Sequence, residues 1–343
     1  MATKRPLPPT SLPAPDLDAA HDPGFDAARE RAARAWRRPQ PGSTRLVGVA
    51  SWTDPTITAG RVFYPEGVDS PEERLRYYAT RFPMVEVDSS YYALPARRTA
   101  ELWVERTPPE FVFNVKANAL MTGQPSEVSR LPKELREALP QSLAESKRIY
   151  AKDLPPELYD AVWAVFLDAM EPLRAAGKLG AVLLQYPRWF LPNRASDNAI
   201  LDAVRRLGRV RGAVEFRNAR WFAPERAEHT LEFLTSHDIP FVAVDEPQGM
   251  ASSVPPIFAV TSPALAMVRF HGRRAAAWEE TGITAVERFR YLYDGDELAA
   301  RIPDVERMTA AAGRTHIVFN NCYGNYGTTN AAEMSALLDE ARP

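Results

Sequence analysis

Residues 85–95 read VEVDSSYYALP, a short strand pattern that ends in two carboxylates and an aromatic loop. Val85 and Val87 alternate with Glu86 and Asp88, so the two acidic side chains lie on one face of the predicted strand. Two serines, two tyrosines and a proline follow, and they end the strand. A single stretch of this kind would not identify a fold, but similar stretches recur along the chain and together indicate one.

Seven further apolar runs recur along the chain, each followed by a turn and a segment with helical periodicity. Runs rich in β-branched and aromatic residues suit strands that are buried on both faces in a parallel sheet. Most spacings are roughly 25–40 residues, which is about what one strand, one helix and two loops require. The eight runs span 45–51, 84–88, 111–117, 180–186, 212–217, 240–246, 266–272 and 316–321. The sequence therefore predicts an α/β fold, a (β/α)₈ barrel of TIM type.

The spacing also predicts the domain organisation. The longest gap, between residues 117 and 180, exceeds one strand-helix unit, so we expect a helical insertion over about 120–178 within a single domain of residues 45–343. Residues 1–44 are rich in proline and include the basic run RERAARAWRR at 29–38. Such sequence buries too little apolar surface to offset its ordering entropy, which predicts a disordered extension with one short basic helix. A docking arm for an acidic partner or for nucleic acid is the alternative.

Bulk composition excludes several classes of protein. The chain has 343 residues, 45% of them hydrophobic and 25% charged, with a net charge of −2, which gives no global field toward nucleic acid or anionic membranes. A single cysteine, Cys322, rules out a disulfide framework, a cysteine-based zinc site and an iron–sulfur cluster. No apolar run approaches a membrane span, and the N-terminus lacks the hydrophobic core of a signal peptide. We expect a cytoplasmic protein.

Polar or charged side chains end nearly every predicted strand. In a closed barrel the C-terminal ends of all the strands converge on one rim, where charged side chains can be paired and hydrated. We therefore expect a common pocket at this rim, walled by the aromatics that follow Asp88. The predicted rim residues are Glu86, Asp88, Asn114, Lys116, Gln185, Glu215, Arg217, Asp245, Arg269, His271, Asn320 and Asn321.

Eight motifs fall in the order seen in a widespread bacterial and archaeal family: VGVASW, FYP, VEVDSSYYALP, FVFNVKA, LLQYP, VEFRNARWF, VRFHGR and FNNCYGNYGTTNA. On these motifs the chain resembles the family catalogued as domain of unknown function 72, also called YecE-like, over about residues 45–340. The resemblance implies a TIM-type barrel and supplies no activity. The chain departs from the family pattern at Asp88, where Asn is usual, and at Gly123 and Asn218, where histidines are usual.

Glu215 and Arg217 form the sharpest site candidate. A glutamate and an arginine at one strand end suit a general base steadied by a guanidinium, which can also grip an anion. Trp221 would form the floor of the pocket. The alternative is a structural ion pair that closes the rim of the barrel.

Lys116 and His271 are the candidate acid partners of Glu215. Partial burial lowers the pKa of a lysine and makes it a plausible base, nucleophile or phosphate contact, although a simple salt bridge would explain it equally. His271 is the only histidine at a predicted rim position. Its role there would be that of a proton shuttle or of a hydrogen-bonded structural residue. Glu86 and Asp245 complete the predicted catalytic set. The predicted substrate contacts are Arg217, Arg269, Gln185, Asn320, Asn321, Trp221 and Asp88.

Cofactor expectations are limited. The loop that contains Gly324 and Gly327 matches no nucleotide-binding fingerprint, although a phosphate cradle is conceivable there. A zinc site of the three-histidine kind is not expected, while Mg²⁺ or Mn²⁺ could be held by Glu86, Glu215 and Asp245.

Three functions remain open on these observations. The first is an enzyme that carries out acid–base chemistry, by hydrolysis, isomerisation or lyase action, on a polar, anionic sugar-like or phosphorylated small molecule. The second is metal-dependent nucleic-acid processing, supported only by the basic extension and the basic loop FHGRR. The third is a non-catalytic protein that binds a metabolite.

Overall fold

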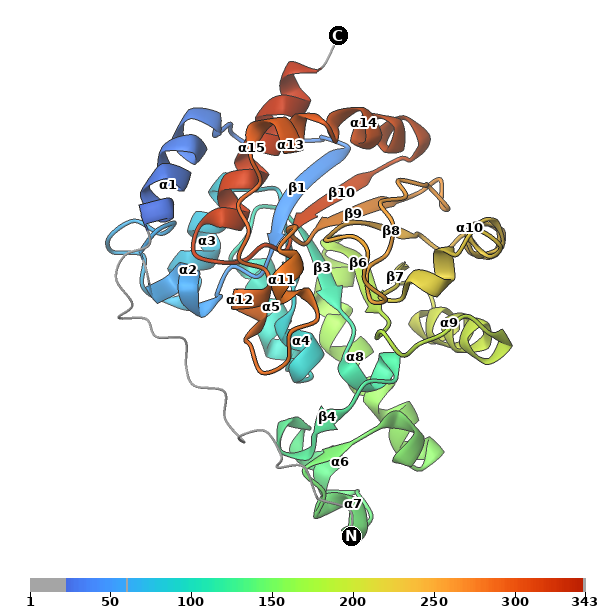
Figure 1. The fold of residues 1–343 in the computed structure, drawn as a ribbon. Coiled ribbons are helices and arrows are strands. Elements are labelled where there is room, and N and C mark those ends of the chain that lie inside the picture. Colours follow the sequence, from blue (N-terminus) through green and yellow to red (C-terminus); the bar gives the residue numbers. More distant parts are fainter. Residues whose placement is uncertain (1–22, 60, 342–343) are drawn as a thin grey trace, which may run out of the picture.

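The computed structural model describes residues 23–59 and 61–341, and its ribbon is a nearly closed barrel of parallel strands surrounded by helices (Figure 1). The eight predicted strands are all present, which confirms the fold class. They are β1 (Arg45–Ala50), β2 (Met84–Val87), β3 (Val112–Lys116), β6 (Leu179–Gln185), β7 (Gly212–Glu215), β8 (Val242–Asp245), β9 (Ala266–Phe270) and β10 (Thr315–Phe319).

The strands neighbour one another in the order β7-β6-β3-β2-β1-β10-β9-β8. Ladders of several residues join each pair in that order. The ends of the order, β7 and β8, meet through one parallel bridge between Val214 and Phe241, where the Val214 N–H donates to the Pro240 carbonyl at 2.8 Å. The β7–β8 seam is therefore the most weakly paired part of the barrel wall.

Helices follow the strands and cover the outside of the barrel. Helix α3 illustrates why they start where they do: the Ser70 hydroxyl accepts from the Glu73 N–H, and the Glu73 carboxylate accepts from the Ser70 N–H, a capping box. The covering helices are α3 (Pro71–Arg81), α5 (Arg97–Glu105), α8 (Pro156–Ala175), α9 (Arg194–Leu207), α10 (Ala227–Ser236), α14 (Ile302–Ala311) and α15 (Tyr326–Glu340). Shorter helices at the strand ends are α2 (Pro55–Ala59), α4 (Ser89–Tyr92), η4 (Ala219–Phe222), α11 (Ala275–Trp278), α12 (Ala285–Arg288) and α13 (Gly295–Ala299).

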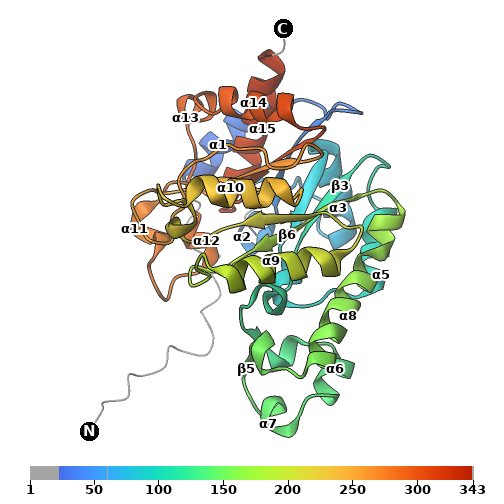
Figure 2. The same cartoon turned by 90° about the vertical axis from the view of Figure 1, so that its right-hand side faces the viewer.

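The predicted insertion lies between β3 and α8 and projects away from the barrel, as Figure 2 shows at its lower edge. It is not purely helical, because β4 (Ser126–Glu127) and β5 (Arg148–Ile149) pair as a small antiparallel sheet. The long helix α8 at its end returns to the barrel and packs against α5. The helical turns of the insertion are η1 (Ala119–Thr122), η2 (Val128–Arg130), α6 (Lys133–Glu137), α7 (Gln141–Ala144) and η3 (Ala151–Asp153).

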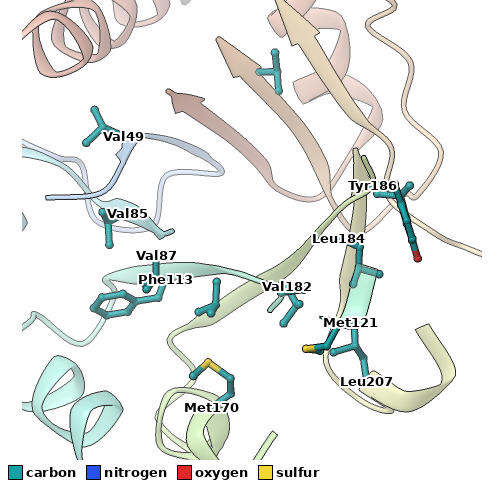
Figure 3. Packing of buried hydrophobic residues seen from close by; sticks show 14 of the residues in the cluster. Val49, Val85, Val87, Phe113, Met121, Met170, Val182, Leu184, Tyr186 and Leu207 are labelled. Atoms are coloured by element: carbon teal, nitrogen blue, oxygen red, sulfur yellow. The ribbon is translucent and has the colours of Figure 1, made fainter. Parts of the chain in front are cut away.

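Two apolar layers fix which strand residues point inward. The larger layer lies between the strands and the helices and includes Val85, Val87, Phe113, Val182 and Leu184, part of which Figure 3 shows. A smaller cluster fills the barrel itself and contains Leu46, Met84, Val112, Leu183, Ala213, Val242, Met267 and Val318. Because side chains alternate along a strand, residues two or four positions beyond these inner residues also point into the barrel.

Part of the predicted extension is ordered against the barrel. Helix α1 (Pro23–Ala35) packs on α15, where Arg31 binds Glu333 bidentately at 2.7 and 2.8 Å. The ring of Phe25 lies 5.2 Å from that of Tyr323 and 5.8 Å from that of Tyr326. One short basic helix was predicted within residues 1–44 and is present, but its packing on the barrel was not predicted, because the partners of α1 lie some 300 residues away in the sequence. Residues 1–22 lie outside the described residues.

No helix in the described parts of the chain combines the length and the apolar character that a bilayer span requires.

Candidate functional site

Arg269 occupies the centre of the barrel mouth. It follows Met267 by two positions on β9, so its side chain points inward, where it is fully buried. Its Nη1 donates to Glu215 Oε2 at 2.7 Å and its Nη2 donates to Glu86 Oε1 at 2.5 Å. The guanidinium thus links the carboxylates of β2 and β7 across the barrel.

Glu215 has a full set of partners. Besides Arg269, its Oε1 receives Gln185 Nε2 and Arg217 Nε, each at 2.7 Å, and His271 Nε2 lies 3.3 Å away. Burial alone would raise the pKa of Glu215, but the Arg217 and Arg269 guanidiniums outweigh it and hold that pKa well below its usual range. The Glu215 carboxylate is therefore expected to stay ionised at neutral pH.

Glu86 shares Arg269 with Glu215 and is equally buried, but it has fewer hydrogen-bond partners. Its Oε2 is buried and has no hydrogen-bond partner among the described residues. Burial raises the pKa of Glu86 to about 7; the Arg269 charge opposes this rise, whereas the neighbouring Asp88 adds to it. One ion pair thus does not compensate for complete removal from water, and the Glu86 carboxyl titrates near neutrality.

Lys116 and Asp88 lie at the more exposed edge of the same cluster. The Lys116 ammonium lies 4.7 Å from the centroid of the Tyr91 ring and makes no ion pair or hydrogen bond within the described chain. Burial lowers the pKa of Lys116, although the charge of Asp88 partly offsets this. Asp88 is 27% exposed, and its Oδ1 lies 4.0 Å from Arg269 Nη2. Neither charge is closely paired.

His271 is enclosed and uncharged at neutral pH. Its Nδ1 lies 3.0 Å from Asn320 Nδ2, and its Nε2 lies 3.0 Å from Arg217 Nη2. Burial and the Arg217 charge lower the pKa of His271 to about 3. A ring with so low a pKa is a weak base, which disfavours the proton-shuttle role predicted for it.

Three predicted site residues lie outside this cluster. The Asp245 carboxylate points away from the barrel interior and is bound by Arg273 at 2.8 Å through both oxygens, by Arg301 at 2.8 Å and by the Tyr293 hydroxyl at 2.9 Å. Asn321 and Trp221 also take part in packing outside the barrel. Asn321 Nδ2 donates to the Tyr291 carbonyl at 2.8 Å, while the Trp221 ring stacks on Phe216 with centroids 4.2 Å apart.

The inward position at the end of β8 belongs to Glu246, which the sequence reasoning passed over. Glu246 continues the inward series from Val242, and its Oε2 receives Arg217 Nη1 at 2.9 Å. The signal was present in the run PFVAVDE, where two adjacent acids necessarily point to opposite faces.

The segment after β9, which contains α11 and α12, lies over part of the barrel mouth. The Trp278 ring at the end of α11 lies 5.2 Å from the Arg217 guanidinium, and the ring of Phe289 lies 5.8 Å from that of His271. Figure 1 shows α11 and α12 beside the strand ends. These two aromatics, rather than Trp221, therefore cover the Arg217–His271 side of the cluster.

The predicted metal ligands are not brought together. Glu86 and Glu215 flank Arg269, whereas Asp245 belongs to the outer cluster with Arg273. Within residues 23–59 and 61–341, no group of three or more histidine, cysteine, aspartate or glutamate side chains is arranged to hold a metal ion. The positions that a cation would take between these carboxylates are filled by guanidiniums.

Two further predicted ligand contacts are also filled from within the chain. In the basic loop FHGRR, Arg273 binds Asp245 and Glu297, and Arg274 binds Glu287. At the proposed phosphate cradle, Gly324 has φ +54° and a Cβ there would meet the Phe25 ring at 2.2 Å, so α1 covers it. Among the described residues, the arginines of the loop and the glycine of the cradle thus already have partners within the chain.

Comparisons with known proteins agree with this fold. The family model described as "Protein of unknown function DUF72" matches residues 46–343. The chain is 30% identical over 296 residues to the UPF0759 protein YunF of Bacillus subtilis, covering 85% of this chain and 94% of that one. A DUF72 family structure from Enterococcus faecalis superimposes with a TM-score of 0.68 at 25% identity, covering 87% and 97% of the two chains. One from Thermotoga maritima gives 0.67 at 29% identity, covering 86% and 99%. The chain therefore belongs to the DUF72 family.

Proposed function

We propose that the barrel mouth is the site of an enzyme that carries out acid–base chemistry on a small polar molecule. Glu86 is the observation that carries this proposal: its carboxyl is fully buried, uses only Oε1 in hydrogen bonding, and has a pKa raised to about 7. A group that titrates near the working pH is suited both to donate and to accept a proton. The role predicted for Glu215 is thus better filled by Glu86.

Glu86 and Glu215 would have different roles, one as the group that transfers the proton and one as a fixed charge, as pairs of carboxyls with separated pKa values do in known enzymes. Glu215, whose pKa is held low by Arg217 and Arg269, would remain charged and hold Arg269 in position. Arg269 would in turn orient Glu86 through its Oε1, leaving Oε2 for the substrate. The proton would move between Glu86 Oε2 and the reacting atom.

The charge distribution favours a substrate that carries an anionic group. Arg217 and Arg269 are engaged by carboxylates, so Lys116, whose ammonium has no counterion, is the cation best placed to meet a phosphate or carboxylate. Gln185 and Asp88 at the same edge would contact hydroxyl groups. This supports a phosphorylated or acidic sugar-like molecule that undergoes hydrolysis, isomerisation or elimination, each of which requires proton transfer.

The test is turnover in D₂O of glucose 6-phosphate, fructose 6-phosphate and glucuronate, followed by NMR for products and for incorporated deuterium. For any compound that is turned over, Glu86→Gln is expected to lower kcat by about 100-fold or more while binding is retained. Lys116→Met is expected mainly to raise KM. Glu134→Gln, a change at an exposed residue of α6, is the matched control.

Turnover that is unchanged in Glu86→Gln would contradict the proposal. Compounds that raise the melting temperature without being converted would instead indicate a non-catalytic metabolite-binding protein, because a ligand that binds only the folded state stabilises it.

A further inference from the structure

A cavity lies on the outer flank of the barrel, between α1 and α3. Its volume is about 560 Å³, which is within the range of small-molecule sites. It shares no lining residue with the inner cluster around Arg269. Its lining residues come from α1, from residues 61–66 after β1, from the end of α3 and from the start of α15, elements that neighbour one another in Figure 1. We call it the α1–α3 cavity.

Positive charge dominates this cavity. Arg29, Arg61 and Arg81 line it, whereas Glu66 is the only carboxylate among its described lining residues. Arg29 Nη2 donates to the Arg61 carbonyl at 3.5 Å, which places these two arginines at one edge. Arg61 has φ +48°, an uncommon backbone conformation for a residue with a side chain. Arg29 Nη1 lies 3.7 Å from Asp26 Oδ1, whereas Arg61 and Arg81 have no ion pair within the described residues. Such unpaired positive charge is a recognition feature for an anion.

Arg81 makes no ion pair within the described residues and is held by aromatic rings instead. Its guanidinium lies 4.3 Å from the Trp36 ring centroid and 5.1 Å from that of Tyr77. Phe63, which packs against Tyr77 at 5.5 Å, extends the aromatic wall. Aromatic walls next to guanidiniums suit a ligand that carries a planar ring as well as an anionic group.

We propose that the α1–α3 cavity binds an anionic small molecule with a planar heterocycle, of the nucleoside monophosphate class. The phosphate contacts Arg29 and Arg61 at the edge, while the ring lies against Trp36 and Phe63. This accounts for Arg29 and Trp36 of the basic run at 29–38, which the barrel mouth does not use.

The experiment is isothermal titration of the full chain with AMP, GMP, CMP and UMP, alongside adenosine and inorganic phosphate. At least one nucleotide is expected to bind with one site per chain, and more tightly than phosphate or nucleoside alone. Arg61→Gln, at an exposed position, is expected to weaken nucleotide binding by about 10-fold while leaving adenosine binding unchanged. Trp36→Phe, which keeps a ring for Arg81, is expected to weaken both ligands.

Arg34→Gln is the matched control on α1, because Arg34 is exposed and does not line the cavity. The proposal is overturned if none of the four nucleotides binds, if phosphate binds as tightly as every nucleotide, or if Arg61→Gln and Arg34→Gln behave alike. Lys116→Met separates the two sites: nucleotide binding that is lost in this variant belongs to the barrel mouth, and the α1–α3 cavity is then not the site.

Discussion

Two buried clusters of carboxylates and arginines lie on opposite faces of the same barrel wall. In the outer cluster, Arg273, Arg301 and Tyr293 use both oxygens of Asp245, so the carboxylate has every partner it needs. In the inner cluster, Arg269 binds Glu86 and Glu215 but leaves Glu86 Oε2 and its own Nε without partners. A buried network in which every polar atom has a hydrogen-bond partner stabilises the fold, whereas a buried polar atom without a partner is available to bind or to transfer a proton.

Removing Arg269 is expected to have the largest effect. Arg269→Met leaves Glu86 and Glu215 buried without their shared guanidinium, which is expected to lower the free energy of unfolding by roughly 3–5 kcal/mol at pH 8. Urea denaturation measures this loss. The loss is expected to shrink at pH 5, because Glu86 is then protonated. A loss that does not depend on pH would contradict the assignment of Glu86 as the titrating group.

Replacing Glu86 by its neutral isostere is expected to change how stability depends on pH. The pKa of Glu86 is raised in the folded state, so its contribution is complete below the unfolded pKa of about 4.5 and is lost as the pH rises through about 7. Relative to the unmodified protein, Glu86→Gln should therefore gain on the order of 2–3 kcal/mol between pH 5 and pH 8. The same measurement on Glu134→Gln is the control, and parallel curves for all three proteins would reject the raised pKa.

Asp245→Asn is expected to destabilise the protein less and to spare the barrel mouth. Arg273 and Arg301 are 29% and 23% exposed, so water can partly replace the carboxylate, and we expect a loss of about 1–3 kcal/mol in unfolding free energy. The pKa of Glu86, followed by carboxyl carbon NMR, is expected to stay unchanged. A shift in that pKa would mean that the two clusters act as one.

Lys116→Met is expected to have the smallest effect on stability. Since the ammonium has no ion pair to lose and its burial is unfavourable, the change in unfolding free energy should lie within about 1 kcal/mol. The charge of Lys116 lowers the pKa of Glu86, so the variant should raise that pKa. Lys133→Met, on the exposed surface of α6, should leave it unaltered. A pKa that does not rise would place Lys116 outside the electrostatic reach of Glu86.

The strands could be predicted because each one is a compact apolar run at a regular spacing, and Glu86, Glu215 and Arg269 followed from alternation along these runs. The choice between Asp245 and Glu246 could not be made in this way, because a strand with two apolar faces does not reveal which of them points inward. Asn320 and Asn321 pose the same ambiguity.

Contacts between residues far apart in the chain also could not be predicted from the sequence. Phe25 packs on Gly324 and Tyr326 at the far end of the chain, and no local pattern in a proline-rich segment reveals such partners. The pKa of Glu86 depends likewise on the geometry of Arg269, which spacing alone does not give.

The β7–β8 seam, where the barrel wall has a single backbone bridge, has a mechanical consequence. Arg217 at the end of β7 holds Glu246 at the end of β8, and Arg269 on β9 reaches across to Glu215 on β7. The ion pairs of the inner cluster therefore hold together the β7–β8 seam, the most weakly paired part of the barrel wall. Local opening of the barrel should therefore begin at the β7–β8 seam. A molecule bound at the mouth should stabilise this seam, so hydrogen exchange of the Val214 amide should become slower when the ligand is bound.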